Sequence, residues 1–218
     1  LHRLRCQAAA GRTEAQGLIT PGTGLHERWK SQVDVIAWFL KQLRYAGVPV
    51  LWRPYHEMNG GWFWWGKKKG EDGYKKLWRM LFDRLVNFHG LNNLIWVYNT
   101  NEVKAGVDPH DTYYPGDEVV DILATDVYTE GFNQQNYDQL LALAGEKPIA
   151  LGEVGALPGL AKLKRQPRWT WFMLWGEPGG VDARTLRQVY ESERALSHQE
   201  LPWVEVKAPR VHEPVLKE

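Results

Sequence analysis

The chain has 218 residues, a formal net charge of +1 and a single cysteine, Cys6. This balance gives no overall field for nucleic acid or an anionic membrane, and one cysteine excludes an intramolecular disulfide or a cysteine-based metal cluster. No apolar run reaches the roughly 20 residues that a membrane-spanning helix requires. The 12 tryptophans are unusual, and their flat apolar faces with a polar N–H suit half-exposed surfaces that contact sugars, peptides or bases.

Short apolar runs alternate with amphipathic helices along the chain. The first helix is predicted at Glu27–Ala46, with Val33, Ile36, Ala37, Leu40 and Leu43 on one face and Gly47 ending it. The sequence then predicts strands at Val48–Trp52, Leu94–Tyr98, Val119–Tyr128, Pro148–Glu153 and Trp169–Trp175, helices at Tyr74–His89, Asn136–Ala144 and Asp182–Leu196, and a helical turn at Leu160–Leu163. Asp182 is the expected N-cap of the last helix.

This alternation favours an α/β fold with a parallel sheet and right-handed crossovers. A doubly wound sheet and a closed (β/α)8 TIM barrel both fit that pattern. From Glu57 to Glu153 the chain runs 96 residues through three strand–helix units, or about 32 per unit, as in a barrel of ~250 residues. No glycine-rich phosphate-binding motif follows a predicted strand, which weakens the doubly wound alternative. The pattern therefore predicts a barrel.

Polar residues gather where the predicted strands end. His56 and Glu57 follow one strand, Asp126 and Tyr128 end another, and Glu153 ends a third. The carboxyl ends of barrel strands carry the catalytic groups of such enzymes. Two facing carboxylates suit glycoside hydrolysis, in which one protonates the leaving oxygen while the other acts as nucleophile or base. The irregular loop with Trp62, Phe63, Trp64 and Trp65 could pack against sugar rings.

Structural explanations exist for the same residues. Glu57 could simply pair with Arg53, His56 could be a structural histidine, and Asp126 could support a loop through hydrogen bonds. The run Lys67–Lys69 is either a solvated loop or a weak patch for single-stranded nucleic acid. His56-Glu57 lacks the second histidine of a zinc-binding HExxH motif. No metal or other cofactor is therefore predicted.

Five blocks, taken together, resemble glycoside hydrolase family 26. They are RPYHEMNGGWFWWG, LNNLIWVYN, YYPGDEVVDILATDVY, KPIALGEVG and WTWFMLWG, and the resemblance extends over Thr20–Leu196. The best-known members of that family are endo-β-1,4-mannanases on a (β/α)8 barrel, with the acid/base on strand 4 and the nucleophile on strand 7. The resemblance implies a retaining hydrolase that cleaves internal β-1,4-mannosidic bonds by double displacement, with Glu57 as acid/base and Glu153 as nucleophile.

The resemblance also implies four substrate-binding residues. His56 would orient the reacting groups or the sugar 2-hydroxyl, and Trp62 would pack around the cleavage point. Tyr128 would hydrogen-bond the nucleophile, and Trp175 would form the floor under the sugar. The expected partner is a β-linked polysaccharide, mannan or a related polymer, with no nucleic acid and no membrane. A polymeric substrate implies an extracellular or periplasmic location.

Alternatives to the mannanase stay open at this point. A β-1,3-xylanase or a mixed-linkage β-glucanase of the same family would carry the same glutamates. A non-catalytic carbohydrate-binding protein on a degenerate barrel is the alternative from another functional class. The sequence does not indicate an oligomeric state.

The resemblance places Glu57 at the end of strand 4, a position that about 100 residues precede in a typical barrel. Only 56 residues precede it here. We therefore expect an incomplete barrel in which strands 4–8 are present and strands 1–3 are mostly missing. The expected organisation is an irregular segment at 1–24, the partial barrel at 25–200 and an extended tail at 201–218. Such a chain would expose the edges of strands 4 and 8.

Overall fold

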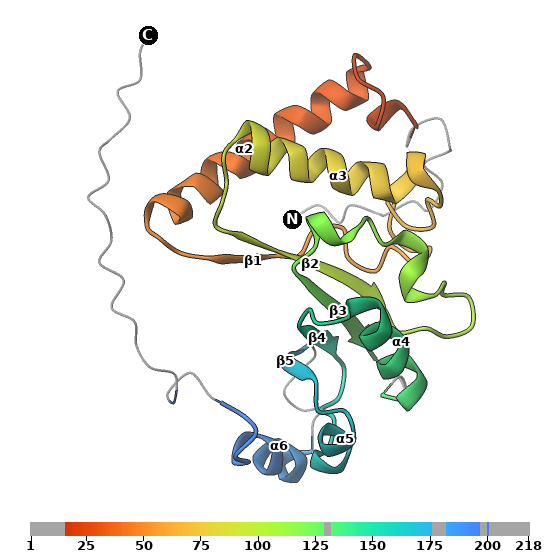
Figure 1. Cartoon of the computed structure of the whole chain (residues 1–218), viewed down its shortest axis with the longest axis vertical. Helices are drawn as coiled ribbons and strands as arrows, with labels where there is room; N and C mark the ends of the chain where they lie inside the picture. Colours follow the sequence, from red (N-terminus) through yellow and green to blue (C-terminus); the bar gives the residue numbers. More distant parts are fainter. Residues whose placement is uncertain (1–15, 129–131, 176–181, 197–199, 201–218) are drawn as a thin grey trace.

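The computed structural model describes residues 16–128, 132–175, 182–196 and 200 (Figure 1). The predicted C-terminal tail at 201–218 and most of the predicted N-terminal segment lie outside the described residues. Within the described part, no helix combines the length and apolarity needed to cross a bilayer.

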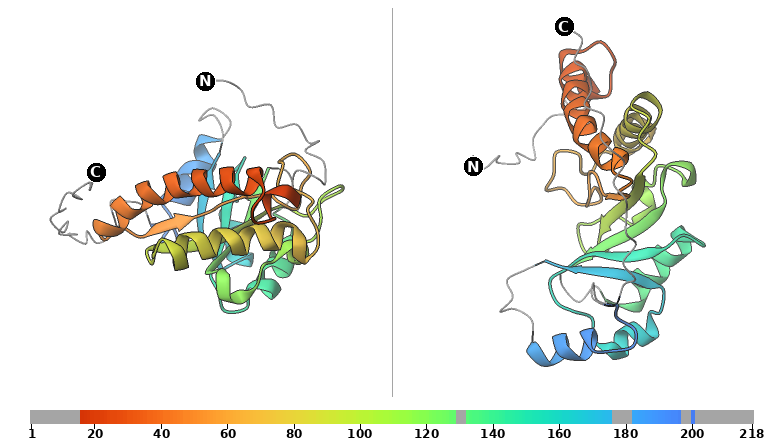
Figure 2. Two further views of the ribbon diagram at one scale, coloured as in Figure 1. Left: turned by 90° about the horizontal axis from the view of Figure 1, so that it is seen from above. Right: turned by 90° about the vertical axis from the view of Figure 1, so that its left-hand side faces the viewer.

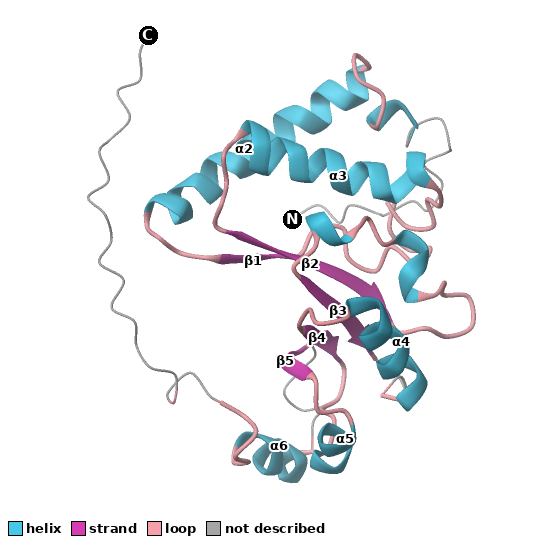
Figure 3. Cartoon of the chain, viewed as in Figure 1, coloured by secondary structure: helices cyan, strands magenta, loops and turns pink. Residues whose placement is uncertain are grey.

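The fold is built on one parallel sheet of five strands. They are β1 (Val50–Trp52), β2 (Leu94–Asn101), β3 (Ile122–Val127), β4 (Ile149–Val154) and β5 (Trp169–Leu174). Each strand pairs in parallel with the next one along the chain, in the order β1-β2-β3-β4-β5. Helical segments connect the successive strands (Figure 3). The predicted α/β alternation with a parallel sheet is confirmed, and all five strand ends lie at one edge of the sheet.

The helices of the fold are α2 (Gly24–Tyr45), α3 (Lys76–Phe82), α4 (Gln134–Ala144), α5 (Leu160–Arg165) and α6 (Ala183–Tyr190). Wider π-helical turns, Glu71–Lys75 and Asp83–Phe88, extend α3 at both ends. Side-chain caps fix three helix starts: Thr23 accepts from the backbone N–H of His26, Asn133 from that of Asn136, and Asp182 from those of Arg184 and Thr185. The predicted cap at Asp182 is therefore confirmed.

Helix α2 turns a different face inward from the one predicted. Val33, Ala37 and Leu40 are buried as expected, but Ile36 and Leu43 are 41% and 40% exposed. The buried stripe instead continues toward the N-terminus through Trp29 and His26, at spacings of three and four residues. The opposite side of α2 and the neighbouring start of the sheet carry exposed large apolar side chains: Leu25, Val35, Ile36, Trp38, Phe39, Leu43, Tyr45, Val48 and Leu51.

Several predicted boundaries also differ. The strand predicted from Val119 begins at Ile122, because residues 117–119 form a 3-10 turn and the Asp121 side chain accepts the N–H of Trp96 at 2.8 Å. Strand β2 continues three residues past Tyr98, to Asn101. That extension places polar residues at the end of the strand, where the functional side chains gather.

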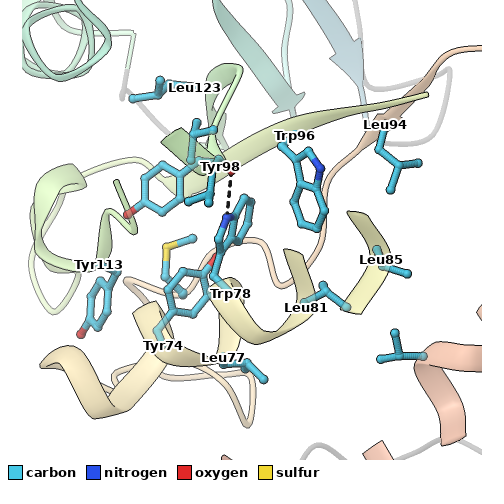
Figure 4. Close-up of a cluster of buried hydrophobic side chains, with 14 of the residues drawn as sticks. Tyr74, Leu77, Trp78, Leu81, Leu85, Leu94, Trp96, Tyr98, Tyr113 and Leu123 are labelled. Carbon is cyan, nitrogen blue, oxygen red and sulfur yellow. Dashed lines mark hydrogen bonds between the residues drawn. The ribbon is translucent and has the colours of Figure 1, made fainter. Parts of the chain in front are cut away.

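A cluster of large aromatic side chains joins α3 to the sheet (Figure 4). Trp78 is fully buried at its centre, in edge contact with Trp96 and Tyr98, and its indole N–H donates to the carbonyl of Val119 at 3.1 Å. The Tyr98 hydroxyl donates to the carbonyl of His110 at 2.8 Å. These two polar tips have partners, whereas among the described residues the buried indole N–H of Trp96 has none. The cluster therefore fixes β2 mainly through the packing of its rings. The two views of Figure 2 show α2 and α3 lying together on one side of the sheet.

Candidate active site

The carboxyl ends of the strands open into one cavity of about 580 Å³. The residues that line it are Arg53, His56, Glu57, Trp62, Phe63, Asn101, Lys104, Tyr128, Glu153 and Trp175. All six residues that the sequence singled out for the site, the two glutamates included, are among them. The remaining four, Arg53, Phe63, Asn101 and Lys104, were not predicted as site residues. The parallel sheet therefore brings together residues that are up to 122 positions apart in the sequence.

Glu57 stands in an unusual backbone conformation beyond the end of β1. Its φ is +56°, in the left-handed region that L-residues with side chains rarely adopt. Its backbone N–H donates to the carbonyl of Asn99 at 2.8 Å, which ties the loop to β2. The carboxylate accepts two hydrogen bonds: Trp62 Nε1 donates to Oε2 at 2.6 Å, and Asn101 Nδ2 donates to Oε1 at 2.7 Å. Backbone strain of this kind is typical of functional sites that surrounding contacts hold in place.

Asn59 supplies the contacts that hold this loop. It is fully buried, and its Nδ2 donates to the carbonyls of Asn101 at 2.8 Å and Asp108 at 3.0 Å. Its Oδ1 accepts the backbone N–H of Asn101 at 2.8 Å. The same asparagine thus positions both the loop that carries Glu57 and the residue that hydrogen-bonds the Glu57 carboxylate.

Glu153 is positioned by an irregularity in β4. Thr125 of β3 pairs with Leu151 and Asp126 with Glu153, so Gly152 is an extra residue in β4, as in a β-bulge that re-aims a neighbouring side chain. A Cβ at Gly152 would lie 1.8 Å from Asn99 Oδ1, so only glycine fits there. The bulge places Glu153 opposite Asp126, with 6% of its surface exposed.

Two donors hold the Glu153 carboxylate. Arg53 Nη2 donates to Oε1 at 2.7 Å, and the hydroxyl of Tyr128 donates to Oε2. The hydrogen bond expected between Tyr128 and the nucleophile candidate is therefore present. The Glu153 charge, in turn, helps burial to raise the pKa of Tyr128 far above its usual range, so the phenol remains a hydrogen-bond donor.

The structural explanation for Glu57, a simple ion pair with Arg53, is wrong. The Arg53 guanidinium lies instead between Glu153 and Asp126, 3.5 Å from Asp126 Oδ2, and also donates to Asn99 Oδ1 at 3.2 Å. Arg53 is the first residue after β1, and its side chain points toward the ends of β3 and β4 rather than toward the loop that carries Glu57.

Asp126 is not a support for a loop, as the sequence suggested. It is a residue of β3, fully buried, beside Arg53 and opposite Glu153. Burial, followed by the neighbouring Glu153 charge, raises the pKa of Asp126 to about 8. At neutral pH the protonated form of this carboxyl therefore predominates.

His56 faces the cavity, and its ring lies 4.9 Å from that of Phe63. Its Nε2 is 3.8 Å from Glu153 Oε1, too far for a hydrogen bond. Burial, and then the Arg53 charge, lower the pKa of His56. The imidazole is therefore uncharged at neutral pH, available to exchange a hydrogen bond with a sugar hydroxyl.

His56, Asp126 and Glu153 also form a cluster with metal-ligand chemistry, their ligand atoms lying within 4.8 Å of one another. The Arg53 guanidinium already contacts both carboxyl groups of this cluster, at 2.7 Å from Glu153 Oε1 and 3.5 Å from Asp126 Oδ2. It supplies the positive charge that a bound cation would otherwise provide, so this donor set fits an arginine site better than a metal site.

The aromatic wall of the cavity is partly exposed. Trp62, in the loop after β1, is 40% exposed, and Trp175, directly after β5, is 59% exposed. Phe63 stacks on Trp65 with ring centroids 4.5 Å apart and planes at 14°.

Lys67 and Lys69 both pair with Asp108, which favours the solvated-loop interpretation of the lysine run over a nucleic-acid patch.

Known proteins share this sequence and fold. The sequence profile of glycosyl hydrolase family 26 matches residues 14–207. A mannan endo-1,4-beta-mannosidase of Thermothelomyces thermophilus is 46% identical over 178 residues, which are 78% of this chain and 35% of the fungal protein. GH26A from Muricauda sp. MAR_2010_75, whose structure is solved, is 49% identical with a TM-score of 0.86, over 88% of this chain and 65% of that one.

A third relative was solved with a sugar. It is the beta-mannanase from a symbiotic protist of the termite Reticulitermes speratus, complexed with gluco-manno-oligosaccharide, 31% identical with a TM-score of 0.76 over 92% of this chain and 62% of that one. The chain thus spans about a third of the curated fungal relative and less than two thirds of the two solved ones. With five parallel strands that form part of a (β/α)8 barrel, it belongs to glycosyl hydrolase family 26.

Proposed function

We propose that this protein hydrolyses internal β-1,4-mannosidic bonds with retention of anomeric configuration. The observation that carries the proposal is the unequal environment of the two glutamates in one cavity. Glu153 accepts from a cationic donor, Arg53, and from the phenol of Tyr128. Among the described residues, Glu57 accepts only from neutral donors, Trp62 and Asn101. A retaining glycosidase requires this difference, because one carboxylate must stay ionised while the other exchanges a proton.

The proposed mechanism is a double displacement. Glu153 attacks the anomeric carbon, and Glu57 gives its proton to the departing glycosidic oxygen. The glycosyl–Glu153 ester forms as the glycosidic bond breaks. Glu57, now a carboxylate, takes a proton from water, and the resulting oxygen nucleophile releases the sugar and restores Glu153. Arg53 and Tyr128 would hold the Glu153 oxygens in position before each cycle.

The proposed substrate follows from the cavity walls and the named relatives. Exposed indoles at Trp62 and Trp175 suit the apolar faces of pyranose rings, and the uncharged His56 would meet a ring hydroxyl. One relative above is a mannan endo-1,4-beta-mannosidase, and another is a beta-mannanase complexed with gluco-manno-oligosaccharide. Because such a polymer does not cross membranes, we place the enzyme's action outside the cytoplasm.

The test is the stereochemistry of the product. The chain is incubated with mannohexaose, and ¹H NMR follows the anomeric protons in the first minutes. We expect the β-anomer to form first, and expect Glu153→Gln to abolish its formation. Glu118→Gln, a change at an exposed residue outside the cavity, is the matched control and should leave the rate unchanged. An initial α-anomer, or full activity in Glu153→Gln, refutes the proposal.

The same assay separates the alternatives. Parallel reactions with β-1,3-xylan and mixed-linkage β-glucan should be slower than with mannan if the substrate assignment is right. Binding of mannan with no cleavage by the unmodified chain would replace the hydrolase with a carbohydrate-binding protein.

A further inference from the structure

Trp62 contacts the site through its polar edge as well as its apolar face. Its indole N–H donates to Glu57 Oε2 at 2.6 Å, a short distance for a nitrogen donor. The other carboxylate oxygen, Oε1, is taken by Asn101 Nδ2 at 2.7 Å. Both donors are N–H groups that cannot accept a proton in return. With both oxygens accepting, this arrangement fits the ionised form of Glu57 and leaves no acceptor for a carboxyl proton.

The two donors differ in how firmly they are held. Asn101 is 4% exposed at the end of β2, and its backbone N–H is bonded to Asn59. Trp62 is 40% exposed and follows two glycines. Its ring lies directly over Gly60, where a Cβ would come within 2.1 Å of it. Asn101 is therefore the fixed donor and Trp62 the movable one.

From this difference we infer that Trp62 is a positioning residue for the acid/base: its N–H binds Glu57 Oε2 while the carboxylate is ionised and leaves when that oxygen carries the catalytic proton. The inference rests on the proposed function, which makes Glu57 the acid/base. It adds a role for the indole nitrogen to the packing role expected for its ring.

The proton balance of the cycle follows from the fixed bond to Asn101. Because Oε1 keeps accepting from Asn101, the proton of the acid form is on Oε2. In the first step the Oε2–H bond breaks, the proton goes to the glycosidic oxygen, and its electron pair stays on Oε2. The anionic Oε2 then accepts the Trp62 N–H again. In the second step Oε2 takes a proton from the attacking water and the indole is displaced once more.

The first experiment does not need activity. The chain is labelled with ¹⁵N at the tryptophan indoles, and the ¹H–¹⁵N signals are followed from about pH 3 to 9; the Trp62 signal is identified by its absence in Trp62→Phe. We expect that signal to move in a single titration step that disappears in Glu57→Gln. The Trp78 indole, which donates to a backbone carbonyl in the core, is the internal control and should not move. A Trp62 signal that is constant, or that titrates equally in Glu57→Gln, overturns the inference.

The second experiment measures the pH dependence of kcat/KM on manno-oligosaccharides. Trp62→Phe keeps an aromatic ring but loses the N–H that favours the ionised carboxylate. The basic limb, which reports loss of the acid's proton, should therefore move to higher pH by about one unit, as expected for one hydrogen bond to a charged group.

Trp175→Phe is the matched control for this shift. Trp175 lines the same cavity, and among the described residues its indole donates to neither glutamate, so its loss should lower the rate without moving the limb. An unmoved limb in Trp62→Phe overturns the inference while leaving hydrolysis intact. An inactive chain in which the Trp62 signal still titrates with Glu57 would instead refute the proposed function and support the indole contact.

Discussion

Replacement of Asp126 by asparagine should change how the stability of the fold depends on pH. Asp126 is fully buried, and burial followed by the Glu153 charge raises its pKa from 3.8 to about 8. When the pKa of a carboxyl is higher in the folded than in the unfolded state, the free energy of unfolding is greatest at low pH, where the carboxyl is protonated in both states. Its contribution is complete below the unfolded pKa and is lost as the pH rises through the folded one. Asparagine is neutral throughout and lacks this loss.

The size of the effect follows from the pKa difference. Between about pH 5 and pH 8 the unfolded chain carries an ionised Asp126, while the folded chain still holds the proton. Each pH unit in that window removes about 1.4 kcal/mol from the free energy of unfolding. Asp126→Asn should therefore gain on the order of 4 kcal/mol relative to the unmodified chain between those two pH values. A constant offset from the altered contact with Arg53 cancels in this difference.

Urea denaturation followed by tryptophan fluorescence measures this difference. Both proteins are unfolded at several pH values from about 5 to 9, and the free energy of unfolding is obtained by linear extrapolation. Titrating groups remote from Asp126 change both curves alike, so the difference between the curves reports Asp126 together with its charged neighbours Glu153 and Arg53. Parallel curves would refute the raised pKa. If Arg53 instead stabilised Asp126 as an anion, the curves would be parallel above about pH 5, and the unmodified chain would lose stability relative to the variant only in the acid range below it.

Two further variants test the contacts around Glu153. Tyr128→Phe removes one donor to Glu153, the proposed nucleophile, and we expect formation of the proposed glycosyl-enzyme from an activated aryl mannoside to slow by about ten- to a hundredfold; an unchanged rate would contradict the positioning role. Gly152→Ala places a Cβ 1.8 Å from Asn99 Oδ1 and should lower the free energy of unfolding by about 1–3 kcal/mol. Gly159→Ala, with nothing within 4 Å of the added Cβ, is its control, and equal losses in the two variants would argue against a specific clash.

The parallel sheet and the position of the candidate site residues at its carboxyl edge could be predicted because each depends on local patterns. Apolar runs separated by amphipathic helices predict a parallel sheet, and polar residues just past those runs predict a site at its carboxyl edge. Glu57, Glu153 and Tyr128, which these patterns predicted together with the resemblance to family 26, line one cavity in the structure.

Residues that act through long-range pairing were not accessible to such patterns. The sequence places Arg53 four residues from Glu57, yet the sheet register directs it to Glu153 and Asp126. Asn101 lies beyond the predicted end of its strand, and its role depends on the contact of Asn59 with β2. The prediction of the buried face of α2 was wrong in part for a similar reason. Ile36 fits the helical period, but the stripe that packs against the rest of the fold begins at His26 and leaves Ile36 exposed.

The protonated state of Asp126 connects the stability of the fold to the chemistry of the site. Arg53 lies between two carboxyl groups, and an ionised Asp126 would compete with Glu153 for its charge. Because burial keeps the proton on Asp126 at neutral pH, the full charge of Arg53 acts on Glu153. In the part of the chain that the structure describes, the donors to Glu57 are the neutral groups of Trp62 and Asn101. One buried proton therefore supports the contrast between a glutamate with a cationic donor and a glutamate whose donors among the described residues are neutral.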